Sequence, residues 1–370
     1  MGFSCGIVGL PNVGKSTIFS AITSAKAAAE NFPFCTIEPN TGAVPVPDDR
    51  LAKLANMAQS QKVIPAQITL VDIAGLIRGA SQGEGLGNQF LGHIRAVDAI
   101  VQVVRAFNDE NVIHVDGAPD PLRDIETIET ELLLADLESV QKQIEKVRKL
   151  AKSNNKEAKS LLDLFQSLEE HLNNGLPSRS FIPSEENEEF QAATTLLLTS
   201  KPTLYVANID ESQLETLNEG GTPESIKLIQ EYAERQGSSV VPICGKLEAE
   251  IAELPKEERA EYLQSVGLER SGFDGLLQSG YRLLGLLTYF TVGPKEARAW
   301  TISEGTAAPQ AAGKIHSDFE RGFIRAEVIS YDDYVICNGE SGAREKGKLR
   351  TEGKEYIMKD GDVVHFRFNV

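Results

Sequence analysis

The sequence is poor in several features that mark whole classes of protein. Its four cysteines are scattered, with no Cys-x-x-Cys pair, which argues against a disulfide framework and against a zinc site. No apolar run approaches the roughly 20 residues that a membrane-spanning helix needs. The chain begins almost directly on a strand-like run, which leaves no room for a signal peptide. We therefore expect a soluble, cytoplasmic protein with reduced thiols.

Positive charge is also scarce. The formal net charge of −17 at pH 7 disfavours a general polyanion binder. The basic residues that are present gather in two stretches, one running from Lys142 to Lys159 and one from Arg344 to Lys354. Either stretch could face nucleic acid, and either could be an ordinary solvated surface. The composition leaves both interpretations open.

What the sequence does contain is a nucleotide-binding signature near its N-terminus. Residues 9–17 read Gly-Leu-Pro-Asn-Val-Gly-Lys-Ser-Thr, after the apolar run 3–8 and before a helical pattern. Gly, four residues and Gly-Lys-Ser between a strand and a helix form the phosphate-binding loop (P-loop) of NTPases. Such a loop turns backbone N–H groups toward phosphates, and the helix N-terminus adds a positive dipole end. The lysine and the hydroxyl favour this interpretation over an ordinary glycine-rich turn.

The phosphate motifs assign roles to individual residues. Lys15 is expected to reach the β- and γ-phosphates, and Ser16 to hold Mg²⁺ through its hydroxyl. Asp72 follows the apolar strand 68–71, and the motif Asp72-Ile-Ala-Gly75 suits a Mg²⁺-sensing carboxylate and an N–H for the γ-phosphate. Thr36 can complete the Mg²⁺ shell through its hydroxyl. The expected phosphate-contacting residues of the loop are Asn12, Val13, Gly14, Lys15, Ser16 and Thr17.

The motifs leave open which residue orients the attacking water. Many glycines follow Gly75, which indicates a mobile loop that could order and disorder with the nucleotide. Leu76 stands where Ras-like enzymes hold the glutamine that orients water, and a leucine cannot do this. Either another group positions water or hydrolysis is slow. His114 could orient or deprotonate water, or could simply be a surface histidine bonded to a neighbour.

A fourth motif, Asn208-Ile209-Asp210-Glu211, closes the strand 203–208. Guanine-specific proteins carry Asn-Lys-x-Asp at this point, and the aspartate accepts from the guanine ring N–H and amine. Here Ile209 replaces the lysine and Glu211 replaces the aspartate. A displaced carboxylate is expected to weaken selection of guanine. Cys244 and Gly245 occupy the position of the loop that would cover the base edge.

The order of elements predicts an α/β fold, with a mostly parallel sheet and helices on both faces. Apolar residues from Leu133 to Ala151 recur at alternating spacings of four and three, which is a heptad seam. This seam predicts a helical coiled-coil hairpin, with a helix packed on the sheet as the alternative. From Tyr289 onward, short strands and turns predict a small β-rich domain. The expected sheet strands are 3–10, 42–46, 68–72, 99–106, 203–208 and 239–243.

These motifs resemble the Obg-like ATPase (YchF) family of translation-factor-class P-loop proteins over nearly the whole chain. The resemblance rests on residues 12–17, 31–40 and 72–77 and on the Asn208-x-x-Glu211 motif. The stretch from Thr288 resembles the TGS domain of threonyl-tRNA synthetase and stringent-response enzymes. The implied domains are a P-loop nucleotide domain (1–125 and 200–286), a coiled-coil insertion (126–199) and a β-grasp-like TGS domain (287–370).

The resemblance also implies a function. It implies hydrolysis of ATP to ADP and phosphate with Mg²⁺, a preference for ATP over GTP, and binding to the ribosome through its large subunit. RNA contacts would come from the stretch Lys142 to Lys159 and from the TGS domain. In relatives, an asparagine at the position of Asn12 helps to hold K⁺, which is therefore a second candidate cofactor. Two alternatives stay open: an Obg-type GTPase, or a nucleotide-gated ribosome-binding module with negligible turnover.

Overall fold

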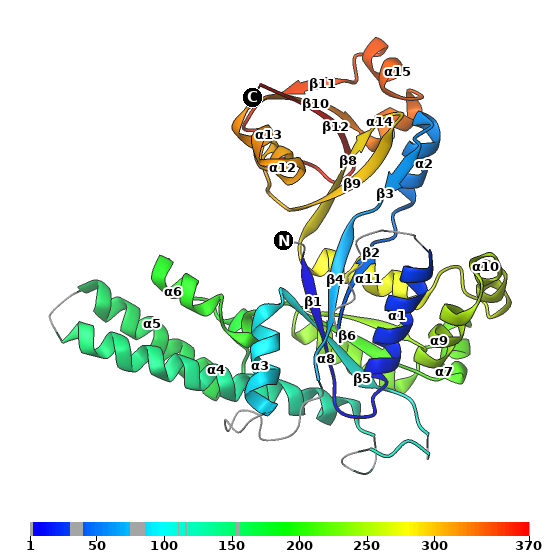
Figure 1. The fold of residues 1–370 in the computed structure, drawn as a ribbon. Helices are drawn as coiled ribbons and strands as arrows, with labels where there is room; N and C mark the ends of the chain where they lie inside the picture. Colours follow the sequence, from blue (N-terminus) through cyan, green and yellow to red (C-terminus); the bar gives the residue numbers. More distant parts are fainter. Residues whose placement is uncertain are drawn as a thin grey trace. The chain divides into compact units, whose positions relative to one another are not determined.

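The computed structural model describes residues 3–29, 40–74, 86–109, 111–114, 117, 119–152 and 156–369. The chain forms two compact units, both drawn in Figure 1. The first unit comprises Met1–Ala43 and Thr69–Gly280, and the second comprises Val44–Ile68 and Tyr281–Val370. No helix in the described ranges is long and apolar enough to cross a membrane.

The first unit is built on a six-stranded sheet with the strand order β2-β4-β1-β5-β6-β7. The pairings of β1 with β4 and β5, of β5 with β6 and of β6 with β7 are all parallel. Every residue of β5 and β6 is buried, as expected for strands covered on both faces. The predicted mostly parallel α/β fold is therefore confirmed. The strands are β1 (Ser4–Val8), β2 (Thr41–Pro45), β4 (Gln67–Asp72), β5 (Ala99–Arg105), β6 (Thr203–Asn208) and β7 (Ser239–Ile243).

The helices of this unit follow the strands, as the repeating pattern predicts. The P-loop leads into α1, and α9 begins directly after the strand β7. In chain order the helices are α1 (Lys15–Ala29), α3 (Leu86–Ala96), α4 (Pro121–Ala151), α5 (Lys156–Asn173), α6 (Glu188–Thr194), α7 (Glu211–Asn218), α8 (Glu224–Arg235), α9 (Gly245–Glu253), α10 (Lys256–Ser265) and α11 (Gly272–Leu283). Two 3₁₀ turns are η2 (Ser178–Ser180) and η3 (Leu198–Ser200).

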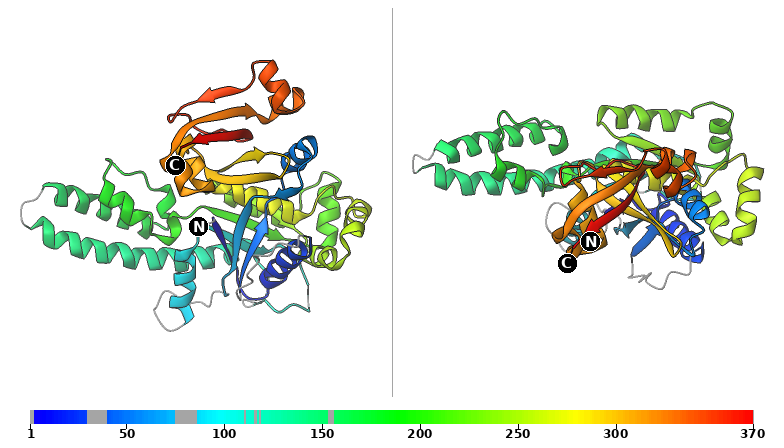
Figure 2. Two further views of the ribbon diagram at one scale, coloured as in Figure 1. Left: turned by 45° about the horizontal axis from the view of Figure 1, so that its top comes forward. Right: turned by 90° about the horizontal axis from the view of Figure 1, so that it is seen from above.

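Helices α4 and α5 form the helical hairpin that the heptad seam predicts, and they extend away from the sheet of their own unit (Figure 2). Asp120 caps α4 by accepting from the Arg123 amide, and Pro121 follows at the first helical position. Val140, Ile144 and Val147 are buried with Leu161 and Leu168 of α5 in one apolar cluster. The two helices therefore cover each other's apolar stripes.

Buried polar contacts fix the base of the hairpin to the sheet. Glu129 of α4 accepts from the Tyr205 hydroxyl of β6 at 2.7 Å and from Arg179 at 3.1 Å. Asp136, about two helical turns further along α4, accepts from the backbone amides of Leu198 and Thr199 at 2.7 Å each. Burial raises the pKa of Asp136, although these hydrogen bonds act against the rise.

The second unit contains the C-terminal sheet that the change in sequence pattern predicts. Its strand order is β11-β10-β12-β8-β9-β3. Strand β12 pairs in parallel with β8, and the β8–β9 and β10–β12 pairings are antiparallel. Its strands are β3 (Lys62–Ile64), β8 (Leu286–Val292), β9 (Glu296–Ser303), β10 (Phe323–Ser330), β11 (Arg350–Glu352) and β12 (Asp362–Phe368). Its helices are α2 (Asp49–Ala58), α12 (Ala308–Ile315), α13 (Ser317–Arg321), α14 (Tyr331–Ile336) and α15 (Glu340–Glu345).

The compact units divide the chain differently from the predicted domains, which kept residues 44–68 with the nucleotide domain. This segment supplies α2 and β3 to the second unit, where β3 pairs in parallel with β9. Leu51, Leu54 and Ala55 of α2 are buried. A short amphipathic helix shows in the sequence that it has an apolar face, but not which sheet that face will cover.

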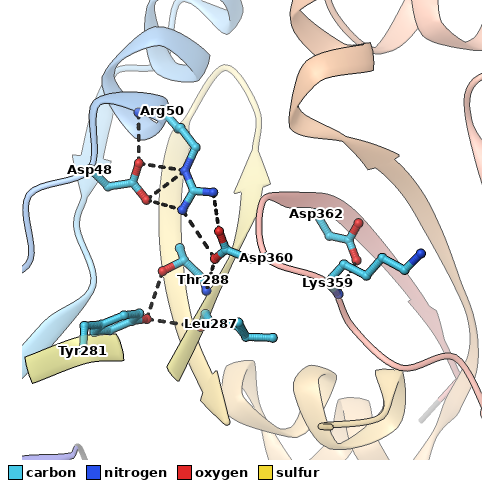
Figure 3. Close-up of polar contacts among 8 residues, drawn as sticks. All are labelled: Asp48, Arg50, Tyr281, Leu287, Thr288, Lys359, Asp360 and Asp362. Carbon is cyan, nitrogen blue, oxygen red and sulfur yellow. Dashed lines mark hydrogen bonds and ion pairs between the residues drawn. The ribbon is translucent and has the colours of Figure 1, made fainter. Parts of the chain in front are cut away.

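Arg50 ties α2 to the C-terminal part of the second unit (Figure 3). Its guanidinium donates to Asp48 at 2.8 Å and to Asp360 at 2.6 Å, and lies over the Phe290 ring. Asp360 in turn accepts from the Thr288 amide at 2.9 Å. Burial alone would lower the pKa of Arg50, but the two carboxylates outweigh it and raise the pKa. The cluster therefore joins segments that are far apart in the chain.

Candidate nucleotide-binding site

The P-loop passes through left-handed backbone at two positions. It connects the end of β1 to the start of α1 at Lys15. Asn12 and Gly14 both have positive φ angles, 63° and 91°. A Cβ atom at Gly14 would lie 2.2 Å from Nδ2 of Asn208, so the position accepts no side chain without displacing that amide. Glycine is therefore required at position 14.

Asn208, the last residue of β6, supports the P-loop through its side-chain amide. Its Nδ2 donates to the Val13 carbonyl at 2.8 Å, and its Oδ1 accepts from the Gly245 amide at 3.0 Å. The side chain is buried, so both bonds form away from water. Val13 itself is also buried, and its carbonyl rather than its side chain takes part in the site.

Lys15, the first residue of α1, faces Asp72, the last residue of β4. In the β1–β4 register Ile7 is opposite Asp72, and the Lys15 ammonium forms an ion pair with the Asp72 carboxylate. The Asp72 amide donates to the Asn40 carbonyl at 2.8 Å. Ligands of parallel sheets bind beyond the carboxyl ends of the strands. The arrangement places a cation and a hard oxygen ligand side by side.

Two adjoining pockets open around these residues. One, of about 580 Å³, is lined by Asn12, Gly14, Lys15, Ser16, Thr17 and Asp72, among others, and is called the phosphate pocket after the P-loop that lines it. The other, of about 850 Å³, shares Asn12, Gly14 and Thr17 with it, includes Asn208, Ile209, Glu211, Cys244 and Gly245, and is called the base pocket after the altered base-recognition motif. The motifs that the sequence singles out at residues 12–17, 72, 208–211 and 244–245 therefore meet in one region.

The base pocket has an acidic and partly exposed rim. Glu211 accepts from the Lys246 ammonium at 2.8 Å, and both side chains are exposed. This hydrogen bond raises the pKa of Lys246. Ile209 and Cys244 are buried below the rim, and burial raises the pKa of the Cys244 thiol. The Glu211 carboxylate thus lies at the mouth of the pocket, where it is already paired with a cation.

His114 lies against the helical hairpin. Its Nε2 hydrogen-bonds to the Asp124 carboxylate of α4 at 2.9 Å, and both side chains are buried. His114 lines neither pocket among the residues with described positions. The carbonyl of the preceding residue, Ile113, accepts a hydrogen bond from Nδ2 of the Asn12 side chain at 3.1 Å. The loop that carries His114 therefore contacts both the P-loop and α4.

Comparison with known proteins places the chain in a family. The ribosome-binding ATPases YchF of Bacillus subtilis and of Escherichia coli O157:H7 are each 52% identical to it over 100% of both chains. The chain belongs to the YchF family. The solved YchF GTPase of Schizosaccharomyces pombe is 38% identical, covering 99% of this chain and 98% of that one, with a TM-score of 0.87.

Two family models match separate parts of this YchF chain. Residues 4–162 match the model described as 50S ribosome-binding GTPase. Residues 286–369 match the C-terminal model of the YchF GTPases, described as a protein of unknown function (DUF933). A GTP-binding protein of Pyrococcus horikoshii, 20% identical with a TM-score of 0.61, shares the fold.

One group of residues that lines the base pocket was not predicted from the sequence motifs. Phe107, Asn108, Asp109 and Val112 line the pocket from the loop between β5 and α4. The signal that could have found them is topological, because ligands bind beyond the carboxyl ends of central parallel strands and β5 is central. Three predicted site residues, Thr36, Gly75 and Leu76, lie outside the described residues.

Proposed function

We propose that the protein is a ribosome-associated ATPase that binds ATP in preference to GTP and hydrolyses it to ADP and phosphate. The observation that carries the proposal is the joined pair of pockets, in which the P-loop with Lys15 continues into a base pocket with the altered motif Asn208-x-x-Glu211. The name shared by the full-length relatives, ribosome-binding ATPase, supports the same assignment. A cytoplasmic location follows from binding to ribosomes.

The described part of the phosphate pocket fits Mg²⁺. Ser16 and Asp72 both line it, and hydroxyl and carboxylate oxygens are the hard ligands that Mg²⁺ prefers. We assign these two residues, with Thr36, to the metal. When bound, Mg²⁺ offsets the charge of the β- and γ-phosphates. Lys15 would exchange its ion pair with Asp72 for the phosphates.

K⁺ is a candidate second cofactor at Asn12. Because Nδ2 of Asn12 donates to Ile113, the side-chain oxygen is the atom left to face a cation. A monovalent cation there would stabilise the charge that develops between the phosphates. We expect faster hydrolysis in K⁺ than in Na⁺ at equal ionic strength, and equal rates would remove K⁺ from the mechanism.

The base preference is tested by titrating ATP and GTP in competition, with Mg²⁺, by calorimetry. The pairing of Glu211 with Lys246 leaves that carboxylate poorly placed for the ring N–H and amine of guanine. We expect ATP to bind at least about tenfold more tightly, or 1.4 kcal/mol. A tenfold advantage for GTP would instead support the Obg-type GTPase, and the Obg-like ATPase assignment would fail.

A further part of the proposal concerns the residue that activates water. Leu76 cannot orient water, and the His114 ring is hydrogen-bonded to the Asp124 carboxylate of α4. We propose His114 as the catalytic candidate. Asp124→Asn is the companion variant, because it weakens the hydrogen bond that holds the His114 ring. Hydrolysis by His114→Ala at the wild-type rate would end the catalytic role. A rate too slow to measure even with ribosomes would favour the nucleotide-gated binding module.

We propose the end of the α4–α5 hairpin as the RNA-facing surface on the large ribosomal subunit. Lys146, Lys149 and Lys152 are exposed there, opposite the buried seam. Changing all three to glutamine should weaken ribosome binding and flatten its dependence on salt. A matched control spreads the same loss of charge over Lys53, Lys227 and Lys295, which are exposed on separate elements. Equal effects from the two sets would mean that the hairpin lysines are only solvated.

We also assign the second unit to the β-grasp-like TGS type, as a second RNA contact. The support is its topology: the β8–β9 hairpin is followed by α12, and the last strand β12 returns parallel to β8. Cross-linking of the ribosome-bound protein tests this contact. RNA cross-links confined to the residues from Lys142 to Lys159 would count against it.

A further inference from the structure

We propose that Arg105 positions the wall of the base pocket that lies between β5 and α4, and so sets nucleotide affinity without taking part in hydrolysis. The inference deepens the proposed function and rests on it, because it takes the pocket as the nucleotide site. Arg105 is the last residue of β5 and is only 1% exposed. A cation buried so completely needs strong acceptors.

The acceptors of Arg105 are backbone carbonyls of one loop. Its Nη1 donates to the Val112 carbonyl at 2.9 Å, its Nη2 to the Asp109 carbonyl at 2.9 Å, and its Nε to the Phe107 carbonyl at 3.3 Å. Its guanidinium carbon also lies 4.6 Å from the centre of the Phe107 ring. One planar group therefore fixes the path of the loop and the placement of its aromatic side chain.

The loop that Arg105 holds is the pocket wall itself. Phe107, Asp109 and Val112 line the base pocket, and Cys244 and Gly245 line another part of it. Arg105 is absent from the lining in the described part of the chain, so it acts from behind the wall. It is a positioning residue rather than a contact to the nucleotide.

Two further contacts fix the end of the same loop. Ile113 accepts from Asn12 of the P-loop, and His114 is bonded to Asp124 of α4. Arg105 holds the middle of the loop, which these two contacts do not reach. A wall that is already ordered in the free protein spares the binding step the entropy cost of ordering it.

Lysine cannot replace arginine in this role, although it keeps the charge. The three carbonyls are contacted by three different nitrogens of one rigid fork, whereas a lysine has a single nitrogen on a flexible stem. In Arg105→Lys the wall should therefore be loose and the base poorly held. The P-loop and the Lys15–Asp72 pair are untouched by this change.

The test compares Arg105→Lys with Arg179→Lys in the full-length protein. Arg179 is a second, largely buried arginine of the same unit, and it donates to Glu129 and Gln236 away from both pockets. For each variant we would measure the melting temperature, the Kd for ADP by calorimetry, and KM and kcat for ATP hydrolysis. Arg105→Met, which cannot donate at all, serves as the more severe variant.

We expect Arg105→Lys to raise the ADP Kd and the ATP KM about tenfold, with kcat within about twofold of wild type. Arg179→Lys should lower the melting temperature without changing the ADP Kd or the ATP KM. Arg105→Met should raise both constants more than Arg105→Lys does. Should Arg105→Met fail to fold, the lysine variant still decides. Unchanged affinity in Arg105→Lys, or an equal loss in Arg179→Lys, overturns the inference alone. A wild-type protein that binds neither nucleotide overturns the proposed function as well.

Discussion

The side chain of Asn208 joins the P-loop to the first residue of α9, with Nδ2 bonded to the Val13 carbonyl at 2.8 Å and Oδ1 to the Gly245 amide at 3.0 Å. Asn208 and Val13 are 195 residues apart in the sequence. The amide holds the proposed phosphate and base ends of the site at a fixed separation. Its contacts are to backbone, so the support does not depend on which base is bound.

Asn208→Asp tests this support. The variant keeps an acceptor for Gly245 but sets a carboxylate oxygen against the Val13 carbonyl where a donor stood. We expect the affinities for ATP and for GTP to fall together, by about 10- to 100-fold, as for a lost buried hydrogen bond. Asn218→Asp, at an exposed amide bonded to the Val266 carbonyl, is the control. Calorimetry showing wild-type affinity in Asn208→Asp would contradict the prediction.

Gly14→Ala should abolish nucleotide binding. The added Cβ meets Nδ2 of Asn208 at 2.2 Å, on a backbone with a φ of 91°. Gly117→Ala is a close control, because Gly117 has a φ of 85° but, among the residues that the structure describes, no atom beyond its chain neighbours lies within 4 Å of the added Cβ. It bears only the backbone cost, about 1–2 kcal/mol of stability. If both variants bind ATP equally, the contact with Asn208 does not control the loop.

Arg50→Ala should destabilise the second unit by about 1–2 kcal/mol, because it leaves Asp48 and Asp360 without their shared donor. The single tryptophan, Trp300, lies in β9, so its fluorescence during urea unfolding reports on this unit. Arg344→Ala breaks only an exposed pair with Glu340 and should cost under about 0.5 kcal/mol. Equal unfolding midpoints for the two variants would exclude a structural role for the cluster in Figure 3.

The second unit should also lose stability in acid through Glu327. Hydrogen bonds from Arg367, at 3.0 Å, and from Arg325, at 3.3 Å, lower the pKa of Glu327 below its ordinary value of 4.5. A carboxylate whose pKa is lower in the folded state stabilises the fold above that ordinary value, and the contribution is lost as the pH falls through the folded value.

Glu327→Gln should therefore flatten the fall in unfolding free energy between about pH 6 and pH 3, followed through Trp300. The glutamine keeps the shape of the side chain and removes the titrating group. Glu355→Gln, an exposed position before Tyr356, is the control and should keep the wild-type slope. A slope in Glu327→Gln that matches wild type would assign the acid sensitivity to other groups.

The sequence predicts those features whose signals are local. The P-loop, the carboxylate of Asp72 at the end of a strand, and the buried parallel strands all follow from short patterns, because neighbouring residues determine them. The heptad seam likewise predicts the α4–α5 hairpin, since an apolar stripe on a long helix needs a partner.

The features that the sequence does not reveal depend on contacts between distant segments. In the sequence Arg105 is only the end of an apolar strand. Its hydrogen bonds to the carbonyls of Asp109 and Val112 depend on how the following loop folds. The bond from His114 to Asp124, and the assignment of α2 to the second unit, also depend on tertiary packing. Local patterns carry no information about which of several possible partners a buried group will meet.

The two-segment construction of the second unit has a consequence for synthesis of the chain. Strand β3 needs β9 as its partner, and β9 leaves the ribosome long after residues 44–68 do. During that interval the sheet on which Leu51, Leu54 and Ala55 pack has not yet been synthesised. In a nascent chain, or in a truncated protein that ends before Leu286, the apolar face of α2 is therefore exposed. Such exposed apolar surface promotes aggregation or binding to a chaperone. Completion of this unit depends on the last quarter of the chain.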